Sequence, residues 1–382
     1  MIHSGIICEY NPFHNGHKKQ IDFVKERGRA VCLMSGNFVQ RGEPAMIDKY
    51  HRAKAAVLCG ADMVFELPLI YALSSAEGFA DGGVEIFSRL GCVDALCFGS
   101  EGGDGEALLD CARLLLSPEF PPELKRQLGK GLSFPKAREL AIENIGGNSQ
   151  LLQKPNNILG IEYCKALLKR SSPIQPVTLL RDGDYHGGQD PQNPSASFLR
   201  QTGSWEGYMP PQALEVFTQA ATYTLEAGER AVLGRLRAME EGDFAALPYG
   251  SEGLWKKLMT SVRTSATVSE ILENTKSKRY PLSRLKRMLL CAYLGISEED
   301  LSMDVPYLRV LAMGPEGQKL LAQLRKSSTI PILHPGDKIP DSPYARLERR
   351  AEDLYQLFAK DQLPTAGLHR KARLFRSTDS SR

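Results

Sequence analysis

The sequence predicts an α/β protein whose first half forms a Rossmann-like parallel sheet and whose second half is mainly helical. Over the first hundred residues or so, short apolar runs alternate with segments of helical periodicity, which is typical of βαβ units. After about residue 205, helical periodicity dominates and strand signals largely vanish. The Gly- and Pro-containing stretch 203–212 marks this change. We therefore expect one domain at 1–205 and a second, mainly helical domain at 206–382.

The predicted strands of the first half are short apolar runs. They cover residues 2–8, 30–34, 62–67, 93–98 and 176–180. Apolar residues at helical spacing predict helices at 17–27, 49–60 and 74–90. The stretch 103–170 is predicted to be mainly helical, with breaks at 117–122 and 146–149. The stretch 182–194, rich in Gly, Asp, Asn and Pro, is predicted to be a long loop.

Composition and charge restrict the class of protein. The 382 residues are 42% hydrophobic and 24% charged, as in ordinary globular chains. Because the formal net charge is only +3, any contact with a polyanion must come from a local patch. The eight cysteines form no CxxC pair and no zinc-type cluster, so we expect reduced, buried cysteines and a cytoplasmic protein. Neither a signal peptide nor a membrane span is expected.

The stretch YNPFHNGHKKQ (10–20) lies between the first predicted strand and the first predicted helix. In a doubly wound sheet, ligands bind at such a place and phosphates meet helix N-termini. Gly16 allows close approach to the backbone. His14 and His17 share one face of the first turn, where a protonated or hydrogen-bonding imidazole can stabilise phosphate charge. The alternatives are two surface histidines of a capped helix or, more weakly, a zinc site without a nearby third ligand.

Two further segments point to the same chemistry. In PSASFLR (194–200), Ser195 and Ser197 precede a predicted helix whose first turn carries Arg200. Hydroxyl groups, helix N–H groups and a guanidinium group together suit a polyphosphate, although a simple N-cap is the alternative for this segment. In FGSE (98–101), Gly99 ends the fourth predicted strand, where a small residue can admit an adenine or a ribose.

With these motifs, the chain resembles the HIGH-type nucleotidyltransferase superfamily, which carries HxGH after the first strand and a later S-x-S-x-x-R. Longer strings are similar to one family, the bacterial tRNA(Met) cytidine acetate ligases. These strings are GIICEYNPFHNGH, MSGNFVQRGEPA, GADMVFELP, LCFGSE, KPNNILGIEY, RDGDYH, SASFLR and KSKRYPLSRLKR. The resemblance spans most of the chain and has its least specific signal in residues 205–270 and 300–382.

This resemblance implies a reaction. Members of the family use ATP to activate acetate as acetyl-adenylate and release pyrophosphate. They then transfer the acetyl group to N4 of the wobble cytidine of elongator tRNA(Met), which forms N4-acetylcytidine and releases AMP. The chain is therefore expected to be an AMP-forming ligase with ATP as co-substrate and with acetate and tRNA as partners. Mg²⁺ is expected to accompany ATP, but no protein ligand for it is assigned.

The resemblance also implies site residues. His14, His17 and Arg200 carry over as the catalytic residues, and Ser195, Ser197 and Arg200 are expected to bind the β- and γ-phosphates. The ATP-binding residues are expected to be Ile7, Cys8, Glu9, Tyr10, Asn11, Pro12, Phe13, His14, Asn15, Gly16, His17, Lys18, Lys19, Gln20, Gly99, Asn156, Arg181, Ser195, Ser197 and Arg200. Since Gln20 is uncharged, either Lys18 or Lys19 is the nearest cation to the phosphates.

Several of these positions have structural alternatives. Asn156 follows Pro155 at the start of a predicted helix and suits an N-cap. Arg181 follows an apolar strand, where it faces either the ligand crevice or solvent. The loop 34–45 follows the second predicted strand and is expected to help form an acetate or cytidine pocket. Its alternative is a plain turn stabilised by Gly36 and Gly42.

The segment 276–287 is the candidate RNA-binding element, because it carries six cations, no acid and one aromatic residue. Such a patch can bind phosphates and stack a base, and its alternative is a solvated helix face. The expected RNA-binding residues are Lys276, Lys278, Arg279, Tyr280, Arg284 and Arg287. The basic tail 369–376 is either an arm that binds RNA or a solubilising end.

Two rival functions follow from the same residues. A small-molecule adenylyltransferase of the nicotinate or phosphopantetheine type needs the same ATP site but no RNA patch, so segment 276–287 argues against it. A non-enzymatic RNA-binding protein with an inactive nucleotide fold would not need intact HNGH and SASFLR motifs. No obligate protein partner is expected.

Overall fold

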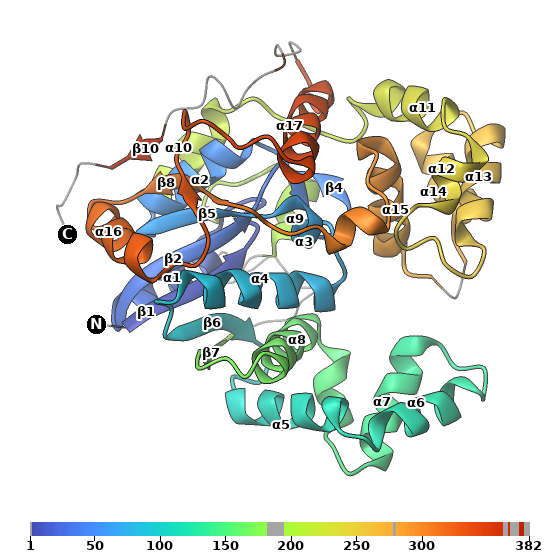
Figure 1. Cartoon of the computed structure of the whole chain (residues 1–382), viewed down its shortest axis with the longest axis horizontal. Coiled ribbons are helices and arrows are strands. Elements are labelled where there is room, and N and C mark those ends of the chain that lie inside the picture. The colour runs from blue at the N-terminus through green and yellow to red at the C-terminus, as the bar shows by residue number, and fades with distance from the viewer. Residues whose placement is uncertain (1, 182–194, 278–279, 362–365, 367–373, 378–382) are drawn as a thin grey trace.

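The computed structural model describes residues 2–181, 195–277, 280–361, 366 and 374–377. Its main sheet has the strand order β10-β8-β5-β2-β1-β6-β7, and β9 pairs with β8 (Figure 1). A separate hairpin pairs β3 with β4. The strands are β1 Ile2–Cys8, β2 Gly28–Ser35, β3 Phe38–Val39, β4 Glu43–Pro44, β5 Met63–Leu67, β6 Ala95–Ser100, β7 Gln175–Leu180, β8 Leu308–Met313, β9 Ile332–Leu333 and β10 Phe375–Arg376.

The five strands predicted from apolar runs are confirmed as β1, β2, β5, β6 and β7, and they pair in parallel. Strand β2 illustrates why these runs are apolar throughout. Its Val31 and Leu33 pack into one hydrophobic core, whereas Ala30, Cys32 and Met34 pack into the other. Both faces of the sheet are covered, so neither set of alternating side chains can be polar.

Helices cover both faces of this sheet (Figure 1). One core includes side chains of α1 Asn15–Lys25, α2 Lys49–Leu58 and α10 Pro211–Gln219. The other core includes side chains of α3 Leu69–Ala72, α4 Ala76–Leu90, α5 Gly105–Leu116 and α8 Pro155–Lys169. Helices α6 Phe120–Leu128 and α7 Phe134–Asn144 extend beyond α5, and the short helix η1 Ser149–Gln153 leads into α8. The predicted helices and the two breaks in 103–170 are confirmed, with small shifts of their ends.

The second half of the chain is mainly helical. Helices α11 Glu229–Arg237, α12 Glu241–Ala245, α13 Leu254–Thr264, α14 Val268–Thr275 and α15 Leu282–Leu294 form a group at one side of the sheet (Figure 1). The remaining elements are α9 Ala196–Thr202, η2 Glu299–Ser302, α16 Gly317–Ser327, α17 Pro343–Tyr355 and η3 Gln356–Phe358. None of the helices in the described ranges is long and apolar enough to cross a membrane.

The expectation that strands vanish after residue 205 is wrong for β8, β9 and β10. Strand β8 lies beside β5 and pairs with it in the antiparallel direction. Strand β10, at the end of the basic tail, pairs with β8, while residues 369–373 of that tail lie outside the described residues. The proposed domain boundary at 205/206 stays a prediction, but the main sheet contains residues from both sides of it.

Buried ion pairs connect β8 to the rest of the sheet and to α17. Arg309 in β8 donates to Glu66 in β5 at 3.1 Å and to Glu348 in α17 at 3.2 Å. Lys49 in α2 lies 2.7 Å from Glu66 and 3.4 Å from Glu352. All five side chains are buried. Burial alone would raise the pKa of Glu66, but Lys49 and Arg309 outweigh burial and lower it. The cluster joins strands and helices that are far apart in the sequence.

The strand order also fixes where a ligand can bind. From β1 the chain passes to β2 and β5 on one side, then crosses to β6 on the other side of β1. The carboxyl ends of β1 and β6 therefore flank a topological switch point, which is the usual ligand crevice of open parallel sheets.

We predict that Arg309→Leu lowers the free energy of unfolding by about 3–5 kcal/mol, because it leaves two buried carboxylates without their shared partner. Denaturant unfolding followed by circular dichroism measures this change. The matched control is Arg113→Leu, which removes an exposed ion pair of 2.6 Å with Asp110 and should cost at most about 1 kcal/mol. Equal losses in the two variants would contradict the structural role of the buried cluster.

Candidate active site

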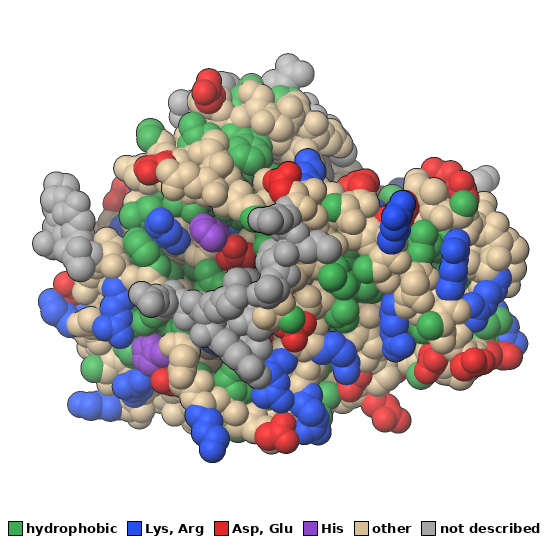
Figure 2. Space-filling view, turned by 90° about the horizontal axis from the view of Figure 1, so that it is seen from above, with side chains coloured by type: hydrophobic (Ala, Val, Ile, Leu, Met, Phe, Trp, Pro, Cys, Tyr) green, Lys and Arg blue, Asp and Glu red, His purple; other side chains and the backbone are tan. Residues whose placement is uncertain are grey.

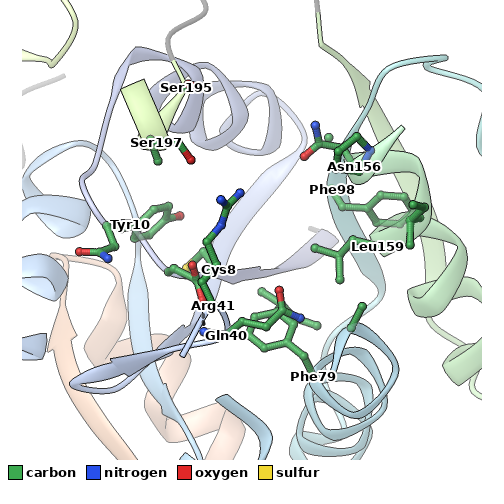
Figure 3. A pocket seen from close by; sticks show the side chains of 18 of the residues that line it. Cys8, Tyr10, Gln40, Arg41, Phe79, Phe98, Asn156, Leu159, Ser195 and Ser197 are labelled. Carbon is green, nitrogen blue, oxygen red and sulfur yellow. Dashed lines mark hydrogen bonds between the residues drawn. The ribbon is translucent and has the colours of Figure 1, made fainter. Parts of the chain in front are cut away.

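A cavity of about 690 Å³ opens at the switch point (Figure 3). Most of the residues that the sequence analysis selects line this cavity. They are Ile7, Cys8, Glu9, Tyr10, Asn11, His14, His17, Gln20, Gly99, Asn156, Arg181, Ser195, Ser197 and Arg200. These residues come from the ends of β1, β6 and β7 and from helices α1, α8 and α9. The structure thus brings together motifs that are nearly 200 residues apart.

The two histidines of the HNGH motif cap helix α1 reciprocally. His14 is the N-cap residue, and its Nδ1 accepts a hydrogen bond from the Gly16 N–H at 3.1 Å. The Nδ1 of His17 accepts from the His14 N–H at 3.3 Å. The two imidazole rings are stacked, with centroids 3.7 Å apart. A Cβ atom on residue 16 would lie 3.1 Å from the His14 ring, so glycine keeps this arrangement uncrowded.

This arrangement fixes the chemical form of both histidines. Because each Nδ1 accepts a backbone N–H, the ring proton of each neutral imidazole is on Nε2. Burial lowers the pKa of His14 well below its ordinary value, and His17, Arg181 and Arg200 lower it further. Burial and Arg181 lower the pKa of His17 to about 3. The lowered pKa values favour uncharged side chains that donate hydrogen bonds from Nε2 at neutral pH.

Of the other residues in the segment 7–20, some line the cavity and some do not. Gln20 lines the cavity and donates to the Cys97 carbonyl at 2.9 Å. Lys18 pairs with Asp22 at 2.5 Å on the outer side of α1. Within the described structure, six predicted ATP-binding residues are not among those lining the cavity. They are Pro12, Phe13, Asn15, Gly16, Lys18 and Lys19. The structure therefore favours neither Lys18 nor Lys19 as the cation nearest to the phosphates of ATP.

Arg200 joins the SASFLR segment to the HNGH loop. Its Nη1 donates to the Asn11 carbonyl at 2.6 Å, and its Nη2 donates to Ser197 Oγ at 3.2 Å. Ser195 is the N-cap of α9 and accepts from the Phe198 N–H at 3.2 Å. Ser195 therefore both caps α9 and lines the cavity.

Glu101 organises the opposite side of the cavity and was not selected from the sequence. Its carboxylate accepts from the backbone N–H groups of Asn156 and Asn157 at 3.1 and 2.8 Å. It also accepts from Asn156 Nδ2 at 2.7 Å, while Asn156 Oδ1 accepts from Arg181 Nη1 at 3.3 Å. Asn156 is therefore not the N-cap of α8, because Lys154 holds that position. The only sequence signal for Glu101 is an acid directly after a strand.

Gly99 provides space for Arg181. A Cβ atom on residue 99 would lie 2.7 Å from Arg181 Cδ. The Arg181 N–H donates to the Ser100 carbonyl at 2.9 Å, which continues the pairing of β6 with β7. Of the two alternatives for Arg181, the crevice position is therefore the observed one. The following residues of the RDGDYH string, 182–186, lie outside the described residues.

The structure does not bring all of the predicted RNA-binding residues to one place. Arg287 is only 9% exposed and lines the cavity, where its Nη1 donates to the Gln40 carbonyl at 3.1 Å. Arg284 donates to the Tyr249 carbonyl and lies over the Tyr280 ring at 4.8 Å. Lys276 follows α14 directly. Lys278 and Arg279 lie outside the described residues. On the face in Figure 2, basic side chains are interspersed with acidic ones.

The described residues do not form a metal site. Within the part of the chain that the structure covers, no three His, Cys, Asp or Glu side chains gather as ligands. The three carboxylates of the cavity already have partners. Glu9 accepts from the Gln40 N–H, Glu43 pairs with Lys286, and Glu101 caps α8. They do not fit a protein-held Mg²⁺, so we derive no step through a metal.

Comparisons with known proteins show which chains and folds this protein resembles. Residues 1–369 match a family model described as HIGH Nucleotidyl Transferase. The tRNA(Met) cytidine acetate ligase of Acetivibrio thermocellus is 38% identical over 86% of this chain and 87% of its own length. The ligase of the same name from Caldanaerobacter subterraneus is 38% identical over 94% of this chain and 95% of its own length. The crystal structure of Thermotoga maritima TmcAL with alpha-thio ATP is 29% identical, with a TM-score of 0.87 over 99% of this chain and 100% of that one.

We predict that His14 and His17 stay neutral, with the proton on Nε2, at pH values where an ordinary histidine is protonated, because burial lowers both pKa values. NMR of ¹⁵N-histidine-labelled protein reports the tautomer and the titration of each ring. His51 is the internal control, since its hydrogen bond to Asp48 raises its pKa. Titration of either motif histidine near the ordinary value of about 6.5 would contradict the capping geometry.

Proposed function

The chain belongs to the tRNA(Met) cytidine acetate ligase family of HIGH nucleotidyltransferases, and from this premise we propose that it is an ATP-dependent ligase that acetylates the wobble cytidine of elongator tRNA(Met). A carboxylate oxygen of acetate attacks the α-phosphorus of ATP, and pyrophosphate leaves with the electron pair of the broken P–O bond. N4 of the cytidine then attacks the acetyl carbonyl carbon. AMP leaves, and N4 loses one proton.

The observation that carries this proposal is the pair of capping histidines at the switch-point cavity. Neutral Nε2–H groups of His14 and His17 donate hydrogen bonds to phosphate oxygens as negative charge moves toward pyrophosphate. Because the pKa values of both imidazoles are lowered, these neutral N–H donors do not change their charge around neutral pH. The protein needs to position the reactants and stabilise charge, which suits phosphoryl and nucleotidyl transfer.

The remaining cavity residues have complementary proposed roles. Ser195, Ser197 and Arg200 bind the β- and γ-phosphates, and the contact of Arg200 with the Asn11 carbonyl aligns them with the HNGH loop. Gly99, Asn156 and Arg181 bind the nucleoside end of ATP. Mg²⁺ is proposed to accompany the phosphates of ATP, and no protein ligand is assigned to it.

The partner proposals rest on the family. The relatives' name supports tRNA(Met) and acetate, and the alpha-thio ATP complex of the Thermotoga maritima protein supports ATP. Lys276, Lys278, Arg279, Tyr280 and Arg284 remain proposed RNA contacts, within a proposed tRNA-binding domain at 206–382. A cytoplasmic location follows from such a substrate. The small-molecule adenylyltransferase and the non-enzymatic RNA-binding protein are not retained, since relatives over most of the chain carry the ligase name.

We predict that the protein incorporates label from acetate into N4-acetylcytidine when it is incubated with ATP and bulk bacterial tRNA. Nucleoside analysis by mass spectrometry measures the product. His17→Ala and Arg200→Ala should each lower the rate at least about 100-fold, because each removes a donor to developing phosphate charge. Pyrophosphate release without labelled RNA would exclude tRNA as the acceptor, and ATP binding without acetate-dependent turnover would exclude the ligase.

We predict that Glu101→Gln raises the KM for ATP about 10-fold, since an NH₂ donor replaces one of the two carboxylate oxygens that accept from Asn156 and Asn157 at the start of α8. Steady-state kinetics with pyrophosphate detection measures the change. Glu143→Gln is the matched control because Glu143 is exposed on α7, and it should leave the KM unchanged. An unchanged KM in Glu101→Gln would rule out this positioning role.

A further inference from the structure

The cavity has a second wall, distinct from the one that the proposed ATP contacts occupy. It is formed by the tip of the β3–β4 hairpin, the start of α4 and the first two turns of α15. We call it the acceptor wall and define it by Gln40, Arg41, Phe79, Ser283, Lys286 and Arg287. Figure 3 shows Gln40, Arg41 and Phe79 around the same cavity as Asn156 and Ser197.

The acceptor wall is formed by close contacts between segments that are far apart in the sequence. Gly42 has a φ of +76°, and a Cβ atom there would lie 2.4 Å from the Arg287 backbone nitrogen. Lys286 Nζ lies 2.5 Å from Glu43 Oε1, and Arg287 Nη1 donates to the Gln40 carbonyl. The hairpin tip is thus held closely against α15, which fixes the positions of Lys286 and Arg287 relative to the hairpin backbone.

Two hydrogen-bond donors at this wall have no acceptor within the described residues. They are Gln40 Nε2 and Arg287 Nε, and both atoms are buried. A buried donor without a partner costs about 1–3 kcal/mol, so its presence in a folded protein requires an explanation. Burial also lowers the pKa of Arg287. A ligand that offers acceptors would remove both costs.

The chemistry of the reaction identifies such a ligand. N4 of cytosine must stay unhindered because it is the nucleophile, so recognition falls on the remaining polar atoms of the base edge, N3 and O2. Both atoms are acceptors and require donors. Proteins recognise unpaired bases through such edge contacts combined with aromatic stacking. The acceptor wall provides amide and guanidinium donors together with the Phe79 ring.

We propose that the acceptor wall is the binding subsite for the target cytosine base, with Gln40 and Arg287 donating to N3 and O2. This inference rests on the proposed function and adds the location and polarity of the nucleobase subsite. It also explains discrimination against uracil. Uracil carries a hydrogen on N3, which would face a donor of the wall. Helix α15 begins at Leu282 beside this subsite, within the segment that carries the proposed RNA contacts at 276–284.

The test separates acetate activation from acetyl transfer. Gln40→Glu replaces the amide donor by an acceptor of the same size. Acetate-dependent exchange of labelled pyrophosphate into ATP, measured without tRNA, should be unchanged. The kcat/KM for tRNA acetylation should fall about 10- to 100-fold. Gln40→Met, which removes the donor without adding charge, should show the same separation. Gln212→Glu on the exposed start of α10 is the control and should change neither rate.

A binding measurement tests base identity directly. Anticodon stem-loop RNAs that differ only in cytidine or uridine at the wobble position are titrated against the wild-type protein and Gln40→Glu. The wild type should prefer cytidine, and the variant should lose or reverse this preference, because its carboxylate can accept the uracil N3–H. If Gln40 had a purely structural role, Gln40→Glu would weaken the binding of both RNAs equally.

Two other outcomes would contradict the proposed cytosine subsite. An equal loss of exchange and transfer in both Gln40 variants would place Gln40 with ATP or acetate instead. Unchanged transfer in both variants would remove Gln40 from recognition. Failure of the proposed function is recognised separately, because the wild-type protein itself would then show no acetate-dependent exchange. In that case the proposal of a cytosine subsite would also be wrong.

Discussion

One buried guanidinium group holds the loops on which both walls of the cavity depend. Arg52 of α2 is fully buried and donates to the backbone carbonyls of Glu9, Gly36 and Ile47. Buried loop carbonyls need donors, and the five N–H groups of a planar guanidinium can serve several at once. Glu9 begins the loop that leads to His14, and Gly36 begins the loop that leads to Gln40. The phosphate side and the acceptor wall therefore share one support, which fixes their separation.

The capping histidines combine a structural role with a chemical one. A serine or an aspartate would also cap α1, but neither would present a second polar atom at a fixed distance on the far side of a ring. With imidazole, the Nδ1 atom is used by the backbone and the Nε2–H is directed by ring geometry. The start of the helix thus selects the tautomer, and no separate residue is needed to orient either ring.

Local patterns were sufficient for some parts of the site and insufficient for others. The HNGH and SASFLR motifs are short, and each lies where a strand or a loop meets a helix, so their positions followed from the order of elements. Glu101 and Arg287 acquire their roles only through tertiary contacts with Asn156 and Gln40. Strand β8 has six apolar-rich residues, too few to distinguish a buried strand from a helix turn. Its pairing depends on Glu66, 243 residues away from Arg309.

The late position of β8 has a consequence for the protein during its synthesis. Strand β5 is entirely buried in the finished sheet, yet its outer edge has no partner until β8 leaves the ribosome. At about 5–20 residues per second, the interval between the two strands is roughly 10 to 50 seconds. An apolar strand edge left open for that time can pair with other chains. The edge of β5 that β8 covers in the finished sheet is therefore open to pairing with other chains for most of translation.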